Sequence, residues 1–159
     1  MEISRRSIAG CILCTMLLLA IPVSGPSAEV QKIPVTFFDD SGRELCRFEA
    51  EPAVTPYEQS RGLMFRSYLP PKYGMLFINE RDEIHHYWMK NVSIPLDIIF
   101  INGKKDVTYV HQNAHPYDET TISSRYPARY ILEINAGEAK ECKIKRGIKT
   151  SFGRSVIDK

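Results

Sequence analysis

Two short segments combine cationic, aromatic and acidic residues in a way that suits a binding site. In RGLMFR, Arg61 and Arg66 bracket an expected helix end, and paired arginines can hold a carboxylate or phosphate group. The second segment contains the single tryptophan of the chain, Trp88, and reaches Asp97 at the start of an apolar stretch. A carboxylate in that position needs a partner or stays protonated. The alternatives are that both arginines are solvated and that Asp97 caps its own turn.

Together the segments predict a small-ligand site with an aromatic floor and a polar rim, the usual form of such pockets. We expect Arg66, Trp88, Lys90 and Asp97 to meet on one concave surface, where Asp97 pairs with a cation. The remaining donors would then be free for an anionic or polyhydroxylated ligand. The expected ligand-binding residues are Arg61, Met64, Phe65, Arg66, Trp88, Lys90, Asn91 and Asp97.

The histidines and methionines are weaker candidates, in both cases for metal binding. His85 and His86 are adjacent, so in a strand they face opposite sides, and the two later histidines straddle a strand end. A zinc site needs three or four convergent ligands, and none is expected. Thioethers suit Cu(I), but methionine more often fills a core, and both interpretations stay open for Met64, Met75 and Met89. We expect no metal and no cofactor.

The chain lacks the common nucleophile, phosphate-loop and zinc-hydrolase motifs, so a binding domain is favoured over an enzyme. One alternative is a small hydrolase with Asp97 or Glu133 as general base. Another is a structural or interaction domain, in which these motifs are turns, caps and core. The net charge of +2, with both signs mixed along the chain, gives no reason to expect nucleic acid or an anionic membrane as partner. The oligomeric state is not predicted.

Residues 1–28 are typical of a secretory signal peptide. Arg5 and Arg6 precede an uncharged run from Ile8 to Val23, and small residues follow up to Ala28. The run is short for a membrane span, which needs about 20 residues, although an uncleaved anchor is the alternative. We expect one globular domain over residues 29–159, located in the periplasm or outside the cell and not attached to the membrane.

Removal of a signal peptide would leave two of the four cysteines, Cys46 and Cys142. In an oxidising compartment they could form a disulfide. The other interpretation is two separate buried side chains, because free cysteine commonly behaves as a small hydrophobe. The sequence leaves both possibilities open.

Apolar alternation predicts about seven short strands, with the strongest signal from Leu96 to Ile101, where both faces should be covered. A capping box of Thr55 and Glu58, ended by Gly62, predicts a short helix. Asn135 with Glu138 predicts a second short helix. Asn102-Gly103 suggests a tight hairpin turn, and residues 113–127 a long loop. The fold class is therefore α+β and β-rich, with a compact barrel- or sandwich-like sheet. The other expected strands lie near 33–37, 46–50, 75–78, 85–89, 107–111, 130–134 and 148–152.

Several motifs occur in an order that resembles the bacterial and archaeal family called domain of unknown function 192. They are RGLMFR at 61–66, GMLF at 74–77, WMKN at 88–91, IPLD at 94–97 and YILEINAG at 130–137. The resemblance covers roughly residues 46–152. It implies a single compact β-rich domain, often behind a signal peptide, and no settled activity. One departure is Gly147-Ile148, where the family usually has a Gly-Asp pair.

Overall fold

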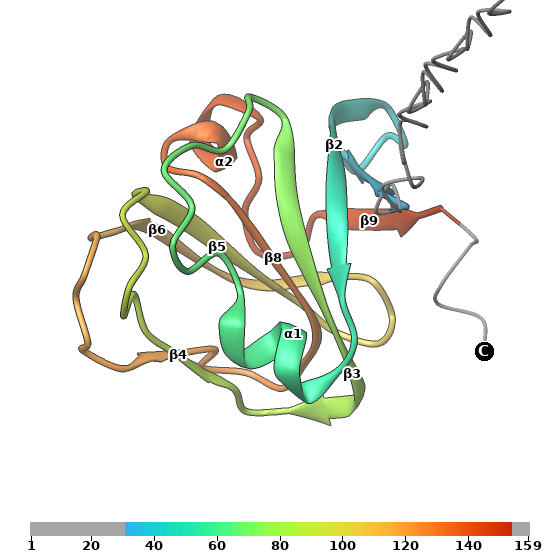
Figure 1. Cartoon of the computed structure of the whole chain (residues 1–159). Helices are drawn as coiled ribbons and strands as arrows, with labels where there is room; N and C mark the ends of the chain where they lie inside the picture. Colours follow the sequence, from blue (N-terminus) through green and yellow to red (C-terminus); the bar gives the residue numbers. More distant parts are fainter. Residues whose placement is uncertain (1–30, 154–159) are drawn as a thin grey trace, which may run out of the picture.

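The computed structural model describes residues 31–153, so the expected signal peptide lies outside the described residues. Within that range no helix is long and apolar enough to cross a membrane. The elements, in chain order, are β1 (Ile33–Phe38), β2 (Glu44–Ala53), α1 (Pro56–Arg61), β3 (Tyr73–Glu83), β4 (His86–Tyr87), β5 (Leu96–Ile101), β6 (Val107–Ala114), β7 (Ile122–Ser123), β8 (Ala128–Asn135), α2 (Glu138–Glu141) and β9 (Lys149–Phe152) (Figure 1).

A seven-stranded mixed sheet forms the body of the domain, in the order β6-β5-β8-β3-β2-β1-β9, and β4 pairs with β7 in a second, small sheet. Only β2 and β3 run parallel among the paired strands of the described residues. The two edges of the sheet touch only at an isolated bridge between Asp106, just before β6, and Lys149 of β9, and among the described residues β6 and β9 do not pair as strands. The sheet therefore does not close into a barrel, and the predicted β-rich α+β class is confirmed in its sandwich-like form.

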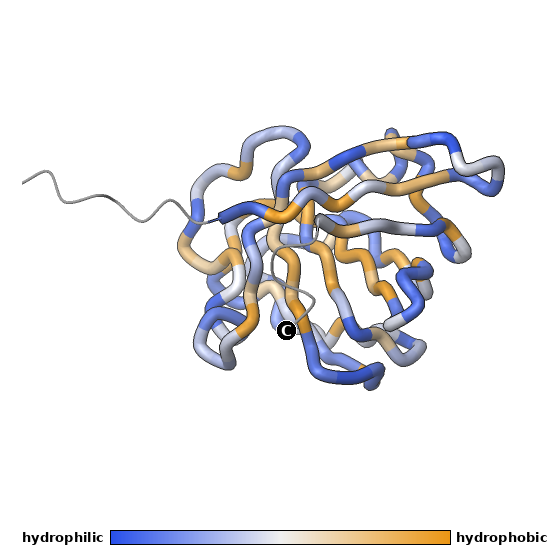
Figure 2. Tube along the Cα trace, turned by 90° about the vertical axis from the view of Figure 1, so that its right-hand side faces the viewer, coloured by the Kyte–Doolittle hydropathy of each residue, from blue (hydrophilic) through white to orange (hydrophobic). Residues whose placement is uncertain are grey.

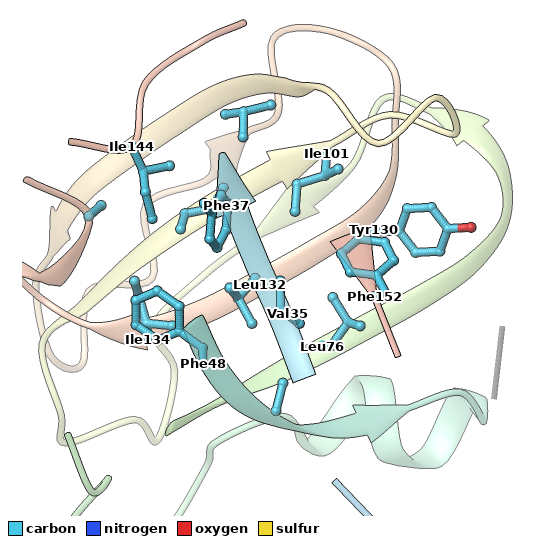
Figure 3. Close-up of a cluster of buried hydrophobic side chains, with 14 of the residues drawn as sticks. Val35, Phe37, Phe48, Leu76, Ile101, Tyr130, Leu132, Ile134, Ile144 and Phe152 are labelled. Carbon is cyan, nitrogen blue, oxygen red and sulfur yellow. The ribbon is translucent and has the colours of Figure 1, made fainter. Parts of the chain in front are cut away.

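Each face of the sheet carries its own hydrophobic cluster, because successive residues of a strand point to opposite faces. On β8, Tyr130 and Leu132 join one cluster, whereas Ile131 joins the other. The first cluster gathers side chains from β1, β9 and the other strands of this sheet, together with α2 and the chain after it (Figure 3). The second lies beneath the segments 63–69 and 89–94. Figure 2 shows the apolar strand segments inside and the hydrophilic turns outside.

The strand β5 is buried along its whole length, as predicted. All six of its residues are buried, and it pairs with β6 on one side and β8 on the other. Its side chains alternate between the two clusters: Ile99 and Ile101 enter the first, and Ile98 and Phe100 the second. The continuous apolar run thus reflects burial of both faces.

The first short helix has the predicted caps, but the second does not. Thr55 and Glu58 form the expected capping box of α1, and the backbone N–H of Gly62 donates to the Glu58 carbonyl. For α2, the residue before the helix is Gly137, at φ 93°, without a side-chain cap. The prediction that Asn135 caps α2 is wrong, because its side-chain amide donates to the carbonyls of Leu69 and Pro70 instead.

Loop geometry accounts for the other differences from the expected elements. The β5–β6 connection is longer than the predicted two-residue turn: the Asn102 N–H donates to the Asp106 carbonyl, and Lys105 takes the positive φ of 66°. The expected loop at 113–127 contains the short strand β7. The expected strand at 85–89 is reduced to β4, which pairs with β7. β3 extends well beyond 75–78 because it pairs with both β2 and β8.

Cys46 and Cys142 form a disulfide, with their Cα atoms 5.6 Å apart. The bond fastens β2 to the chain immediately after α2. It joins segments separated by 96 residues, which is the pairing that the sequence alone left open.

Candidate ligand-binding cleft

A cleft of about 340 Å³ opens between α1 with its following turn, β4, and the end of β3. One wall comes from the α1 end, another from the chain around β4, and the floor reaches the sheet. The residues that give the cleft its polar and aromatic character are Gln59, Arg61, Asn79, His86, Tyr87, Trp88 and Glu133.

Glu133 is a buried acid at the base of the cleft. It lies on β8, in register with Met75 of β3 and Ile98 of β5, so its side chain shares the face of the second cluster. The residue is 6% exposed, and nothing among the described residues forms a hydrogen bond or ion pair with its carboxyl group. Burial raises the pKa of Glu133 to about 8. The group is therefore mostly protonated at neutral pH and can both donate and accept hydrogen bonds.

Two aromatic residues lie beside this acid. Trp88 lines the cleft and is 51% exposed, a large exposed fraction for an indole ring. The Lys90 ammonium lies 5.2 Å from the centre of the Trp88 ring. Tyr87 packs edge-on against Phe77, with ring centres 5.3 Å apart. Burial, followed by the nearby Glu133 carboxyl group, raises the pKa of Tyr87, so its hydroxyl stays protonated.

The polar wall is held in place by hydrogen bonds to the backbone. The side-chain amide of Gln59 donates to the carbonyls of Ala53 and Ile78, and that of Asn79 donates to the Arg129 carbonyl. These contacts orient both amide oxygens as acceptors. His85 Nε2 lies 2.9 Å from the Ala128 carbonyl, so this nitrogen carries the proton. Burial lowers the pKa of His85 and favours its neutral form.

Asp97 does not belong to this cleft, which corrects the predicted convergence. The side chain is fully buried, and its oxygens accept hydrogen bonds from the backbone N–H groups of Asn113, Gly137 and Ala139 at 2.9–3.0 Å. The expected pairing of Asp97 with a cation is wrong, because backbone donors from two distant loops supply its partners. Asp97 is therefore a structural cap.

Six of the other predicted ligand residues divide between two hollows, and the seventh, Lys90, lines neither and lies over the Trp88 ring. Arg61, Met64 and Trp88 line the cleft. A separate hollow of about 250 Å³ is lined by Phe65, Arg66 and Asn91. The arginine in this hollow is already paired: its guanidinium contacts both carboxylate oxygens of Glu51, at 2.8 and 2.5 Å. Arg66 holds the pKa of Glu51 low. The predicted meeting of Arg66 with Asp97 is wrong, because Glu51 is its partner.

The family model of DUF192, "Uncharacterized ACR, COG1430", matches residues 37–152. The chain belongs to this family. The resemblance seen in the sequence motifs is thereby confirmed, over a slightly longer stretch than expected.

Two solved structures resemble this DUF192 domain. One is a proposed transcription regulator from Sinorhizobium meliloti 1021, with 36% identity, a TM-score of 0.73, and coverage of 76% of this chain and 93% of the other. The second is a protein of unknown function from Novosphingobium aromaticivorans DSM 12444, with 41% identity, a TM-score of 0.72, and coverage of 84% and 94%. No curated protein matches the chain.

The methionines and histidines of this DUF192 domain were the candidate metal ligands. Met75 and Met89 are buried in the second cluster, and Met64 packs against it. Within residues 31–153, no group of three or more histidine, cysteine or acidic side chains is placed to hold a metal ion.

Glu133 is the cleft residue that the sequence predicts only as an alternative general base and not as part of the ligand site. The available signal was a single acid within the apolar strand YILEI. Strand alternation places this acid on the same face as Ile131, which is a buried face.

Proposed function

We propose that this DUF192 domain binds a small polyhydroxylated ligand in the cleft beside Trp88. The observation that carries the proposal is the buried carboxyl group of Glu133, which has no hydrogen-bond partner among the described residues. Burying such a group unpaired is unfavourable. A ligand hydroxyl reaching the base of the cleft would supply the missing hydrogen bonds.

The rest of the lining suits the same ligand class. The half-exposed ring of Trp88 offers a flat apolar surface for a sugar-like ring, and the amide oxygens of Gln59 and Asn79 offer fixed acceptors for hydroxyl groups. An anionic ligand, the other class expected from the sequence, would meet the carboxyl group of Glu133. The polyhydroxylated class is therefore favoured.

Catalysis is a second candidate function, and Glu133 favours it as well. A carboxyl group with a pKa of about 8 can give or accept a proton near neutral pH, as a general acid or base does. Asp97, the other acid considered for this role, is committed to backbone hydrogen bonds. A small hydrolase would therefore use Glu133.

Fluorescence provides a direct test, because Trp88 is the only tryptophan in the chain and lines the cleft. The purified protein is titrated with a panel of monosaccharides, disaccharides and polyols. We expect a saturable change in Trp88 emission for at least one compound. Glu133→Gln should retain this binding, because an amide also donates and accepts, whereas Glu133→Leu should weaken it about tenfold or more.

Glu44→Leu is the matched control, since Glu44 is an exposed acid at the start of β2, and its binding should equal that of the wild type. If no compound gives saturation, or if Glu133→Leu binds as tightly as the wild type, the proposal is wrong. Hydrolysis of the bound compound that is lost in Glu133→Gln while binding persists would establish the enzymatic alternative.

Export is part of the proposal and is supported by two features. The N-terminal segment has the order of a signal peptide, and disulfides such as Cys46–Cys142 persist mainly in oxidising compartments. Mass spectrometry of the protein from a periplasmic fraction should find cleavage between about Ser24 and Ala28. An intact Met1 in the membrane fraction would contradict this expectation.

A further inference from the structure

A second pocket, of about 400 Å³, lies along β6 and shares no lining residue with the Trp88 cleft. Three chain segments contribute to it: β6, the turn after β7, and the turn between α2 and β9. Its charged lining residues are Arg125, Lys145 and Arg146, and none of its lining residues is an aspartate or glutamate. The pocket is therefore strongly basic, although the whole chain is near neutral.

Both arginines of this basic pocket are held against tyrosine rings. The guanidinium carbon of Arg125 lies 4.6 Å from the centre of the Tyr109 ring, and that of Arg146 lies 4.1 Å from the Tyr126 ring. Arg146 Nη1 also donates to the Tyr126 hydroxyl at 2.8 Å. Stacking on an aromatic face orients a guanidinium and leaves N–H groups at its edge for an anion.

These cations are not neutralised within the protein. Across residues 31–153, no carboxylate lies within ion-pair distance of Arg125, Lys145 or Arg146, in contrast to Arg66, which is paired with Glu51. The neighbouring His111 responds to this charge: burial and then Arg125 lower its pKa. The positive potential of the pocket is thus available to a ligand.

The backbone on both sides of the basic pocket is fixed by hydrogen bonds. The buried Ser124 hydroxyl donates to the Tyr126 carbonyl and accepts from the His85 N–H. On the other side, the Ile148 N–H donates to the Lys145 carbonyl, and the Gly147 N–H donates to the Val107 carbonyl of β6. The backbone that carries the cationic residues is therefore positioned before any ligand arrives, which lowers the entropic cost of binding.

We infer that the basic pocket binds a small molecule carrying a dianionic oxyanion, with a phosphate monoester as its class. Two oriented guanidinium groups match phosphate oxygens bidentately, and an added ammonium group favours a dianion over a singly charged carboxylate. The volume falls within the range of small-molecule pockets, about 300–1,000 Å³, which leaves room for the organic part of the monoester. This site is independent of the ligand proposed for the Trp88 cleft.

Isothermal titration calorimetry with the purified protein tests this inference, using glycerol 3-phosphate and inorganic phosphate as probes. Sodium chloride at equal ionic strength and glycerol serve as control ligands. We expect saturable binding of glycerol 3-phosphate that Arg125→Gln and Arg146→Gln each weaken about tenfold or more. Arg47→Gln, an exposed arginine on β2, should bind like the wild type. The His111 pKa, followed by NMR, should rise on binding, and Trp88 emission should not change.

Three results would overturn the inference: no saturation beyond the chloride control, an equal loss in Arg47→Gln, or a response to inorganic phosphate but not to glycerol 3-phosphate. Binding of a DNA duplex without binding of glycerol 3-phosphate would assign the pocket to nucleic acid and would overturn it as well. If either arginine variant has a lowered melting temperature, Lys145→Gln replaces it, because within residues 31–153 the Lys145 side chain forms no hydrogen bond, ion pair or ring contact. Unchanged affinity in Lys145→Gln would also contradict the inference.

Discussion

The Asp97 carboxylate on β5 accepts a hydrogen bond from the backbone N–H of Gly137, 2.9 Å away and 40 residues later in the chain. The same oxygen accepts from the Ala139 N–H, and the other oxygen accepts from the Asn113 N–H. Because Gly137 has no side chain to cap α2, an acid from the sheet does so. One buried carboxylate thereby fastens both α2 and the end of β6 to β5.

Removing this cap should strongly destabilise the domain. We expect Asp97→Ala to lower the free energy of unfolding by about 3 kcal/mol or more, because three backbone N–H groups lose their acceptor and a fully buried side chain is removed. Urea denaturation followed by circular dichroism measures this change. Asp118→Ala is the control: this exposed acid accepts from the nearby Thr120 N–H, and its loss should change the free energy by less than about 1 kcal/mol. Equal effects in both variants would contradict the role of Asp97.

Reduction of the Cys46–Cys142 disulfide should also weaken the fold. Its closed loop is long, so the bond removes much entropy from the unfolded chain, and an effect of about 2–4 kcal/mol is expected. Urea unfolding with and without dithiothreitol gives the difference, and the Cys46→Ser/Cys142→Ser double variant should match the reduced wild type. In oxidised protein that lacks residues 1–28, and with them Cys11 and Cys14, two titratable thiols would show that the bond is absent.

Glu133 should make stability depend on pH. Its pKa is about 8 in the folded protein and near 4.5 ordinarily, so the folded state binds more protons than the unfolded chain between these values. The stability present at low pH is therefore lost as pH rises through this window. The Glu133→Gln side chain cannot ionise. Its free energy of unfolding should therefore equal that of the wild type near pH 4 and be a few kcal/mol higher at pH 8 and above.

Urea unfolding at pH 4, 6 and 8 measures this difference between Glu133→Gln and the wild type. Taking the difference cancels other titrating groups, such as His85, that both proteins share. Glu44→Gln, at an exposed acid, should show no such divergence. If the difference in free energy of unfolding between Glu133→Gln and the wild type stays constant across this pH range, the pKa of Glu133 is not raised by folding.

Close contact between β3 and β8 should make Gly74 intolerant of a side chain. A Cβ atom at Gly74 would lie 2.5 Å from the Glu133 carbonyl oxygen, so the two strands would have to separate. We expect Gly74→Ala to lower the free energy of unfolding by about 1–3 kcal/mol, measured by thermal or urea denaturation. Gly103 is the control, because the atom nearest to a Cβ there is at the flexible end of the Asp82 side chain. Gly103→Ala should hardly change the free energy of unfolding. A loss as large as that of Gly74→Ala would contradict this explanation.

The elements that were predictable share a local physical origin. The capping box of α1 involves residues within one helical turn of each other, so Thr55 and Glu58 sufficed to place it. The burial of β5 follows from its own composition, since an apolar run of this length is stable only when both faces are covered. Asn135 had an equally good local pattern for α2, but the carbonyls of Leu69 and Pro70 compete for its amide.

Sequence patterns alone predicted the family, the β-rich class, and Arg61, Met64 and Trp88 as candidate residues of the cleft. The partners of the buried acids became known from the fold: Asp97 is a cap, Arg66 pairs with Glu51, and Glu133 is the acid of the cleft that has no hydrogen-bond partner among the described residues. Local features such as capping boxes and strand alternation depend on the spacing of residues along the chain, which the sequence gives directly. The partner of a buried charge depends on which distant segments the sheet brings within hydrogen-bond distance, and no local pattern encodes that choice.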